Sequence, residues 1–290
     1  MTTGADHPMT GPATTSVVQI RGVDKVFAGR DRGQTVALQA IDFDVAPGEF
    51  VSLIGPSGCG KSTLLRVIGD LVQPTRGTVV VNGKPAPQAR RDRDYGMVFQ
   101  APVLFDWRSV EDNVKLPLEI LGKDKAYRNK RAKEMLELVE LGDFTKHMPY
   151  QLSGGMQQRV AIARALSFEP RILLMDEPFG ALDEMTRERM NDEVLRIWQQ
   201  TGTTVVFVTH SIPEAVYLSS RVVVMSARPG RITKIVDIDL PRPRDDASRE
   251  TPRYFELITE VREALRAGGG DVDDAGIPSA ARTMAEGAVG

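Results

Sequence analysis

Nine consecutive residues at positions 55–63 have the composition and spacing of a polyphosphate-binding loop. They fit the pattern G-x-x-x-x-G-K-[ST], and they follow an apolar segment that is predicted to be a strand. The glycines let the backbone wrap closely around a polyphosphate, so that successive N–H groups point inward. The lysine can reach the β- and γ-phosphates as a mobile charge, and the serine after it can bind Mg²⁺. The predicted loop comprises Gly55, Pro56, Ser57, Gly58, Cys59, Gly60, Lys61, Ser62 and Thr63.

A second phosphate-binding surface is predicted about 90 residues further along the chain. The sequence Leu-Ser-Gly-Gly-Met-Gln-Gln-Arg occupies positions 152–159. The turn formed by Ser153, Gly154 and Gly155 is predicted to open a helix, so backbone N–H groups, a hydroxyl and the positive end of the helix dipole meet there. Two phosphate-binding surfaces in one chain suggest that two chains close face to face around ATP.

Two adjacent carboxylates follow an apolar segment at 172–175. A buried strand there would hold Asp176 at its carboxyl end, where it can fix Mg²⁺ through water. Glu177 is then placed to polarise an attacking water molecule. The alternative for Glu177 is a surface carboxylate that opens the next turn, because Pro178 follows directly.

Apolar patterning predicts the elements that must position these residues. Strands are predicted at 17–21, 36–45, 50–54, 78–81, 95–98, 172–175, 205–209, 222–225 and 231–238. Helices are predicted at 61–69, 109–122, 127–141, 153–168, 183–200, 213–218 and 252–266. In the helix at 183–200 the residues Met190, Val194, Ile197 and Trp198 fall on one apolar face. The alternation of strands and helices predicts an α/β fold with a parallel core and antiparallel strands added early.

Composition limits the classes of function. The chain has 290 residues, 41% of them hydrophobic, and a net charge of −2, which argues against a general nucleic-acid binder. Its one cysteine, Cys59, rules out an intramolecular disulfide and suits a reducing cytoplasm. No apolar run approaches the roughly 20 residues that span a bilayer, and 1–16 lacks the apolar centre of a signal peptide. Association with a membrane is therefore expected only through a partner.

The order of these motifs resembles that of the ATP-binding-cassette (ABC) ATPases. The resemblance rests on the loop at 55–63, the Ser-Gly-Gly turn at 153–155, and the pair Asp176 and Glu177. It implies a P-loop NTPase core with a parallel sheet, an antiparallel β subdomain and a helical signature subdomain at about 101–168. The ATPase domain is expected at 17–267, between a disordered arm at 1–16 and a Gly- and Ala-rich disordered tail at 268–290. Two copies would dimerise head to tail around two ATP molecules.

The same resemblance implies roles for four further residues. His210 would contact the γ-phosphate, and Gln100 would contact Mg²⁺ and the attacking water. Asp183 would cross the dimer interface, although it could also serve as the N-cap of the helix that follows. Phe27 would stack on adenine, and its alternative is packing in the core. Met156 stands where the family most often has Gln, so a polar contact from that side chain is lost.

Weaker motifs resemble those of ATPase subunits from bacterial importers of the nitrate, sulfonate and taurine type. They occupy positions 152–159, 176–183, 225–232 and 240–244. This implies a peripheral protein on the cytoplasmic face of the membrane, bound to integral permease subunits and acting indirectly with a solute-binding protein. The segment 101–113 is the expected permease contact, with Phe105 and Trp107 either exposed there or packed in the subdomain core. Because Cys59 lies inside the phosphate loop, alkylating it is expected to block ATP binding, and MgATP is expected to protect it.

Three other functions are alternatives. An exporter or lipoprotein-release ATPase shares every catalytic motif, and only the weaker motifs argue against it. A DNA-maintenance ATPase would carry long coiled coils or zinc modules between the two phosphate motifs, and this chain has no room for them. A ribosome-associated protein would carry two cassettes and basic linkers, whereas this chain has one cassette and a net negative charge.

Overall fold

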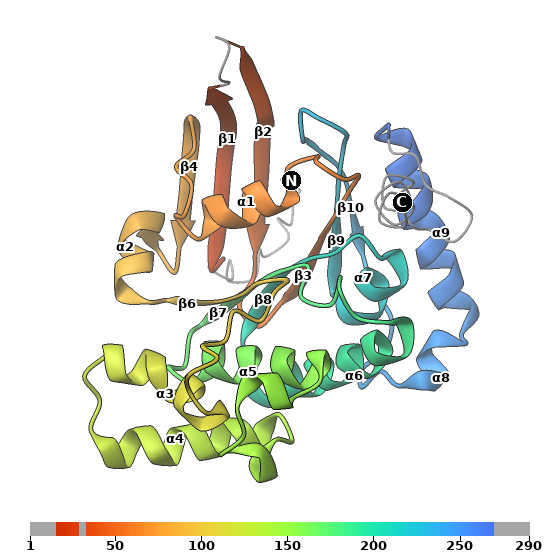
Figure 1. The fold of residues 1–290 in the computed structure, drawn as a ribbon. Coiled ribbons are helices and arrows are strands. Elements are labelled where there is room, and N and C mark those ends of the chain that lie inside the picture. Colours follow the sequence, from red (N-terminus) through yellow and green to blue (C-terminus); the bar gives the residue numbers. More distant parts are fainter. Residues whose placement is uncertain (1–15, 29–32, 270–290) are drawn as a thin grey trace, which may run out of the picture.

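The structure, a computed structural model, describes residues 16–28 and 33–269. Nearly all of the predicted N-terminal arm and C-terminal tail therefore lies outside the described residues. The described part forms an α/β body on two sheets, with a group of helices at one end (Figure 1). This confirms the fold class predicted from the sequence.

The central sheet has six strands in the order β10-β9-β3-β8-β7-β6. All of its pairings are parallel except that of β10 with β9 at one edge. Every residue of β3, β7 and β8 is buried, as expected for strands that are covered on both faces. The strands are β3 (Phe50–Ile54), β6 (Tyr95–Val98), β7 (Ile172–Asp176), β8 (Thr204–Val208), β9 (Arg221–Met225) and β10 (Ile232–Asp237).

Alternate residues of these strands face two separate hydrophobic cores. In β3, Val51 and Leu53 belong to one core, whereas Phe50 and Ile54 belong to the other. The first core is shared with helix α1 (Lys61–Ile68) and with the antiparallel sheet. Helix α1 contacts strands of both sheets, so the loop that precedes it is fixed between them.

The antiparallel sheet has the order β2-β1-β4-β5. Its strands are β1 (Val18–Ala28), β2 (Gln34–Val45), β4 (Arg76–Val81) and β5 (Lys84–Pro85). Strand β1 is longer than the predicted segment 17–21, because pairing with β2 continues as far as Ala28. Helix α2 (Ala86–Asp92) and β5 were not predicted. Only Ala86 and Ala89 of α2 are buried, which is too weak an apolar pattern to be read from sequence.

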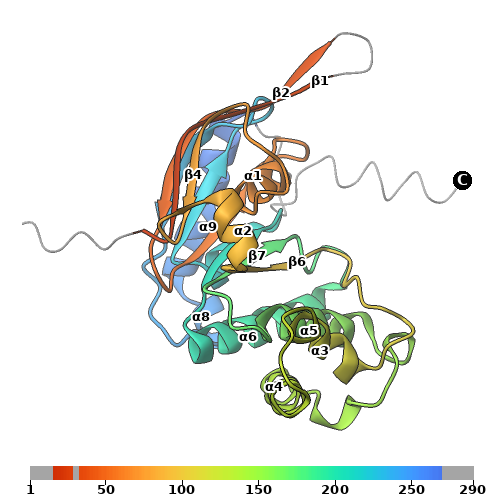
Figure 2. The same ribbon diagram turned by 90° about the vertical axis from the view of Figure 1, so that its left-hand side faces the viewer.

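Three helices pack on one another at the lower end of the molecule (Figures 1 and 2). They are α3 (Val110–Ile120), α4 (Lys125–Leu138) and α5 (Gly154–Leu166). Short 3₁₀ turns at Gly142–Phe144 and Pro149–Gln151 join α4 to α5. Each helix begins with a side chain that caps its first turn, namely Ser109, Asp124 and Ser153. These helices lie within the predicted helical subdomain at 101–168.

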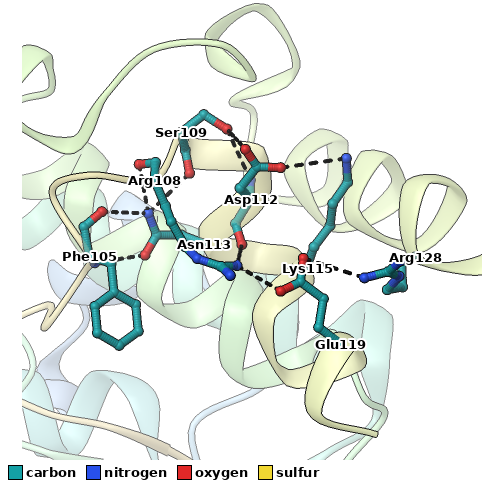
Figure 3. A network of polar contacts seen from close by, with 8 residues as sticks. All are labelled: Phe105, Arg108, Ser109, Asp112, Asn113, Lys115, Glu119 and Arg128. Carbon is teal, nitrogen blue, oxygen red and sulfur yellow. Dashed lines mark hydrogen bonds and ion pairs between the residues drawn. The ribbon is translucent and has the colours of Figure 1, made fainter. Parts of the chain in front are cut away.

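A buried asparagine fixes the turn that precedes α3 (Figure 3). The Nδ2 of Asn113 donates to the carbonyl oxygens of Phe105, Arg108 and Ser109 at 3.1, 3.0 and 3.0 Å, and its Oδ1 accepts from the Phe105 N–H at 2.8 Å. An ion pair of 2.8 Å between Arg108 and Glu119 ties the same turn to the far end of α3. The turn at 105–109 is therefore held on α3 by a side chain with no exposed surface.

The remaining helices are α6 (Glu184–Thr201), α7 (Ile212–Leu218), α8 (Asp246–Arg249) and α9 (Pro252–Ala267). The predicted apolar face of α6 is confirmed, because Met190, Val194 and Ile197 are buried and Trp198 packs against the same core. Helix α8 is a single turn with no buried residue, and it was not predicted. Within the described ranges, no helix is both long and apolar enough to cross a membrane.

Two arginines of the Leu-Pro-Arg-Pro-Arg segment at 240–244 cap the C-terminal end of α7. Arg244 donates to the carbonyl oxygens of residues 216, 217 and 219, and Arg242 donates to that of Leu218. The Arg242 guanidinium also lies 4.2 Å from the ring centroid of Trp198 on α6. Positive side chains satisfy the last carbonyls of a helix and interact favourably with its dipole. This segment, used above only as a family marker, thus fixes α7 against α6.

Candidate active site

The topology brings the predicted chemical groups to one edge of the central sheet. The phosphate loop follows β3, His210 follows β8, Asp176 and Glu177 come at the end of β7, and Gln100 follows β6. These strands are adjacent in the order β3-β8-β7-β6 and all run parallel. Their carboxyl ends therefore meet at one edge, where α/β sheets commonly bind ligands.

The phosphate loop is held by close backbone approaches. Gly60 has a φ of 111°, and a Cβ there would lie 2.8 Å from Leu38 Cδ2 and 2.9 Å from the Ala37 carbonyl oxygen. Only glycine fits this position. The Nζ of Lys61 donates to the carbonyl oxygens of Gly55 and Pro56 at 2.8 and 3.2 Å, so its charge lies within the loop.

The thiol of Cys59 lies beneath this loop, not inside it. The side chain is 1% exposed and belongs to the core shared by α1 and the two sheets. A Cβ at Gly55 would lie 2.8 Å from its Sγ. Burial raises the pKa of the Cys59 thiol despite the nearby Lys61 charge. The sequence predicts that alkylation of Cys59 blocks ATP binding and that MgATP protects the thiol. A buried thiol with a raised pKa should instead react slowly whether or not MgATP is present.

Oxygen donors from two elements meet at the start of α1. The Ser62 hydroxyl donates to Oδ1 of Asp176 at 2.6 Å, and Arg66 Nη2 lies 3.5 Å from Oδ2. Gln100 follows β6 at the same edge of the sheet, and its Nε2 lies 3.2 Å from where a Cβ of Gly180 would be. Hydroxyl, carboxylate and amide oxygens are the hard donors that Mg²⁺ prefers, so Ser62, Asp176 and Gln100 suit that ion.

Glu177 and His210 face each other across neighbouring strands. Oε2 of Glu177 lies 3.5 Å from Nδ1 of His210. The hydrogen bond from His210 lowers the pKa of Glu177 more than partial burial raises it, and the Lys61 charge lowers it further. Glu177 is therefore ionised at neutral pH and can accept a proton or a hydrogen bond from water.

The backbone of Glu177 is in the left-handed region, with a φ of 47°. This conformation is uncommon for a residue with a side chain and costs on the order of 1–3 kcal/mol. The Glu177 N–H donates to the Val208 carbonyl oxygen at 3.0 Å, and the Gly180 N–H donates to the Glu177 carbonyl oxygen at 3.1 Å. Backbone hydrogen bonds on both sides therefore hold Glu177 in this strained conformation.

The second predicted phosphate surface begins α5. Ser153 is the N-cap and accepts from the Met156 N–H at 3.3 Å. Gly155 is buried against α6, and a Cβ there would lie 3.1 Å from Thr186 Cγ2. A Cβ at Gly154 would lie 3.4 Å from Leu182 Cδ2. The glycines thus let this turn at 153–155, called the signature turn below, pack tightly against α6 and the segment before α6.

The two phosphate surfaces do not come together within one chain. Figures 1 and 2 both place α1 beside the antiparallel sheet and α5 among the lower helices. A surface hollow of about 350 Å³ beside the Ser-Gly-Gly turn at 153–155 is lined by that turn, by α5 and α6, and by Glu140 just after α4, and by no residue of the phosphate loop. Its lining includes Ser153, Gly155, Met156, Thr186 and Arg189.

The remaining two predicted site residues have clear surroundings. Asp183 is the N-cap of α6, and its Oδ1 accepts from the Thr186 N–H at 3.0 Å, which lowers the pKa of the carboxyl. Phe27 lies on β1, is 40% exposed and belongs to neither hydrophobic core. Its stacking on adenine stays a prediction. The Nζ of Lys25 lies 4.8 Å from the centroid of that ring.

Sequence reasoning missed the residues that support the phosphate loop from behind. Arg228 donates to the Gly58 carbonyl oxygen at 3.1 Å, and a Cβ at Gly230 would lie only 2.1 Å from the Cys59 carbonyl oxygen. Both belong to the segment at 225–232, which served above only as a family marker. Its contacts with the loop depend on long-range packing and could not be read from the motif itself.

Comparisons with known proteins agree with this geometry. The family described as ABC transporter matches residues 38–180. An uncharacterized ABC transporter ATP-binding protein of Methanocaldococcus jannaschii is 49% identical over 244 residues, covering 84% of this chain and 90% of the relative. An aliphatic sulfonates import ATP-binding protein, SsuB of Bacillus cereus, is 44% identical over 252 residues, covering 87% of this chain and 97% of the relative.

The chain belongs to the ABC transporter family.

Among solved structures, the dimeric structure of the bacterial ABC transporter cassette MJ0796 has a TM-score of 0.67 and 37% identity, covering 76% of this chain and 98% of that chain. The same cassette in a post-hydrolysis state is bound to ADP and Pi, with a TM-score of 0.66 and 35% identity, covering 76% of this chain and 98% of that chain. The family and the enzyme class predicted from the sequence are confirmed: this ABC protein is an ATPase that binds ATP.

Proposed function

We propose that this ABC ATPase drives an importer that takes up a small solute of the nitrate, sulfonate or taurine kind through a membrane permease. The similarity to the aliphatic sulfonates import protein of Bacillus cereus supports this direction and solute class. The chain would act on the cytoplasmic face of the membrane, where it binds integral permease subunits. A solute-binding protein would deliver the solute to the permease and would meet this chain only indirectly.

The residues at the sheet edge have complementary roles in this proposal. Backbone N–H groups of the loop at 55–63 and the charge of Lys61 bind the phosphates, while Phe27 stacks on the adenine. Ser62, Asp176 and Gln100 hold Mg²⁺, which supplies positive charge near the phosphates when bound. Ionised Glu177 orients and accepts a proton from water, and His210 contacts the γ-phosphate. Such catalysis works mainly through positioning and electrostatic stabilisation.

The dimeric arrangement in this proposal rests on the separation of the two phosphate surfaces. Within one chain, the loop beside α1 and the signature turn at the start of α5 lie in different parts of the molecule (Figures 1 and 2). Both can bind the same ATP only if the turn comes from a second copy. Ser153, Gly154 and Gly155 of one copy would then close the site of the other, with Asp183 at the interface.

Exposed apolar side chains near Gln100 support a permease contact. Trp107 is 74% exposed, Val103 is 58% exposed, and the Phe105 ring lies 4.8 Å from that of Trp107. Their segment is bound to the signature helix α5: Gln158 donates to the Phe99 carbonyl oxygen at 2.9 Å, and Arg164 donates to those of Pro102 and Val103. A movement of α5 on dimer closure would therefore move the segment 101–113, the expected permease contact.

The catalytic assignment is tested with Glu177→Gln, which keeps the side-chain size and removes the base. We expect ATP hydrolysis to fall by about 10²- to 10⁴-fold while ATP binding is retained. MgATP should then trap a dimer, measured by size-exclusion chromatography with light scattering. Lys61→Ala is the contrasting variant and should weaken ATP binding itself. Hydrolysis by Glu177→Gln at the wild-type rate would refute the role of Glu177.

The importer assignment needs a separate experiment. The tagged wild-type chain is purified from gently solubilised cells, and its partners are identified by mass. Recovery of a multi-span membrane protein is expected, and uptake of candidate anions by vesicles containing that partner would define the solute and the direction. Recovery of ribosomal or DNA-bound proteins, with nothing from the membrane, would refute the importer and leave the ATPase chemistry intact.

A further inference from the structure

A buried carboxyl group lies four residues after His210, the residue proposed above to contact the γ-phosphate. Glu214, in the first turn of α7, is 5% exposed. Its Oε1 is buried and has no hydrogen-bond partner among the residues that the structure describes. No role in the hydrolysis proposed above accounts for this side chain. Burying a carboxyl group with one oxygen unpaired is costly, so its presence calls for a specific contact.

That contact is made to the residue immediately before His210. The Thr209 hydroxyl donates to Oε2 of Glu214, and the same hydroxyl accepts from the Ser211 N–H at 3.0 Å. The Glu214 N–H in turn donates to the Ser211 hydroxyl at 3.4 Å. His210 therefore lies between two residues that are both tied, directly or through Thr209, to Glu214.

This arrangement differs from ordinary capping of a helix. Ser211 is the N-cap of α7 and Glu214 is the third helical residue, which is the spacing of a capping box. In a capping box the glutamate would accept from the N–H of the N-cap residue itself. Here the Thr209 hydroxyl accepts from the Ser211 N–H instead, and the carboxylate binds that hydroxyl. Helix capping alone therefore does not explain why the carboxylate reaches back to β8.

The far end of α7 is also fixed. Arg242 and Arg244 bind its last carbonyl oxygens. Because α7 is held at both ends, the position of Glu214 is fixed. Its hydrogen bond with Thr209 can then fix the backbone next to His210. The other end of the chain of contacts is the pair of His210 and Glu177, 3.5 Å apart.

We propose that Glu214 is a positioning residue that holds His210 in line with Glu177 through the Thr209 hydroxyl. This inference rests on the role proposed above for His210. The charged groups that act on Glu214 are His210, and Arg187 and Glu184 of α6. Burial raises the pKa of Glu214 to about 7, which agrees with a carboxyl group held for its hydrogen bond and not as part of an ion pair.

The experiment measures single-turnover hydrolysis of radiolabelled ATP with enzyme in excess, together with the affinity for ATP. Glu214→Ala should lower the rate by roughly 10- to 100-fold, because misplacing a catalytic group by about 1 Å can cost that much. ATP affinity should change little. Glu214→Gln keeps an acceptor for the Thr209 hydroxyl and should restore most of the rate.

Thr209 gives an independent test if Glu214→Ala does not fold. Thr209→Val keeps the shape of the side chain and removes the hydroxyl, whereas Thr209→Ser keeps the hydroxyl. The valine variant should be slowed in the same way as Glu214→Ala, and the serine variant should not. Equal rates for the two variants would overturn the proposal.

A double-mutant cycle separates positioning from general damage to the fold. In a His210→Ala background, adding Glu214→Ala should have no further effect, because the residue to be positioned is gone. A further loss equal to that in the wild-type background would overturn the proposal. So would a wild-type rate for Glu214→Ala while His210→Ala is slow. A wild-type rate for His210→Ala would instead refute the proposed role of His210, and the positioning role with it.

Discussion

Local geometry at single residues decides what the motifs can do. Glu177 illustrates this, since its sequence position fits either a catalytic base or a surface carboxylate at a turn. The structure gives it a φ of 47° and places its carboxylate 3.5 Å from His210. The pKa of Glu177 is lowered, and the hydrogen bond from His210 is the largest cause. A strained, ionised carboxylate facing a histidine at a sheet edge favours the catalytic interpretation.

Cys59 is the residue for which the sequence was most misleading. We expect the thiol to react with N-ethylmaleimide at least about tenfold more slowly than an exposed cysteine, because it is 1% exposed and burial raises its pKa. MgATP should add little protection. A time course of labelling by mass spectrometry checks this, with the chain unfolded in urea as the reactive control. Rapid labelling that MgATP suppresses would support the original expectation instead.

At the scale of elements, helices α3, α5 and α7 each connect a site residue to the rest of the fold. Helix α5 begins with the signature turn and binds the segment after Gln100 through Gln158 and Arg164. Helix α7 follows His210 directly and is capped by two arginines that come later in the chain. Helix α3 holds the turn that carries Trp107.

The hold of α3 on that turn depends on Asn113. Asn113→Ala should lower the free energy of unfolding by about 2–4 kcal/mol, because it leaves several backbone groups of the turn at 105–109 unpaired. Urea unfolding measures the change. Ile120→Ala, at a 66% exposed position on the same helix, is the control and should change stability by less than about 0.5 kcal/mol. Equal effects of the two substitutions would contradict the role of Asn113.

The buried carboxylate on α7 should make stability depend on pH. The folded-state pKa of Glu214 is about 7, above the ordinary value of 4.5, so the folded protein binds the extra proton between these values. Stability should therefore fall as pH rises from about 4.5 to about 7 and stay reduced above that range. Arg187, Glu184 and His210 act on the group but do not reverse this direction.

Glu214→Gln removes this dependence. The quantity to compare is the free energy of unfolding of the variant minus that of the wild type. This difference should be larger at pH 8 than at pH 5 by an amount on the order of 1–3 kcal/mol. Urea unfolding of both proteins at the two pH values provides the comparison, and groups common to both cancel. A constant difference across this range would show that Glu214 has a pKa near its ordinary value.

At the scale of the whole molecule, the exposed groups point to the surfaces that partners cover. Trp107 is 74% exposed, and the sequence had left open whether it packs in the subdomain core. Phe27, Ser153 and Gly154 are exposed on other parts of the chain. A protein that is complete only as a dimer on a permease would leave such groups uncovered when it is alone.

The permease surface is tested with Trp107→Ala. Loss of a central interface tryptophan typically costs at least about 2 kcal/mol, so association with the permease should weaken by roughly 30-fold. ATP hydrolysis by the isolated chain should be unchanged. Phe255→Ala, at a 57% exposed position on α9, is the matched control and should leave association intact. Co-purification of the Trp107 variant with the permease at the wild-type level would place the interface elsewhere.

Long apolar strands and helices could be predicted from the sequence because their burial leaves a regular pattern. Strands β3 and β6 have the predicted bounds, and the other predicted elements differ by a few residues at their ends, apart from the longer β1. Helices α2 and α8 were missed because they bury few or no side chains. Their formation depends on neighbours in space that a linear pattern does not encode.

The sequence by itself determined the chemistry that lies in contiguous segments. The phosphate loop, the Ser-Gly-Gly turn and the pair of Asp176 and Glu177 each work through local backbone geometry, which a short motif specifies. The tertiary structure decided everything that depends on which distant residues meet. It buried Cys59, exposed Trp107, joined Glu214 to Thr209, and placed the signature turn away from the phosphate loop of the same chain. The reason is physical: burial and long-range hydrogen bonds are properties of packing, and packing is shared among elements far apart in the sequence.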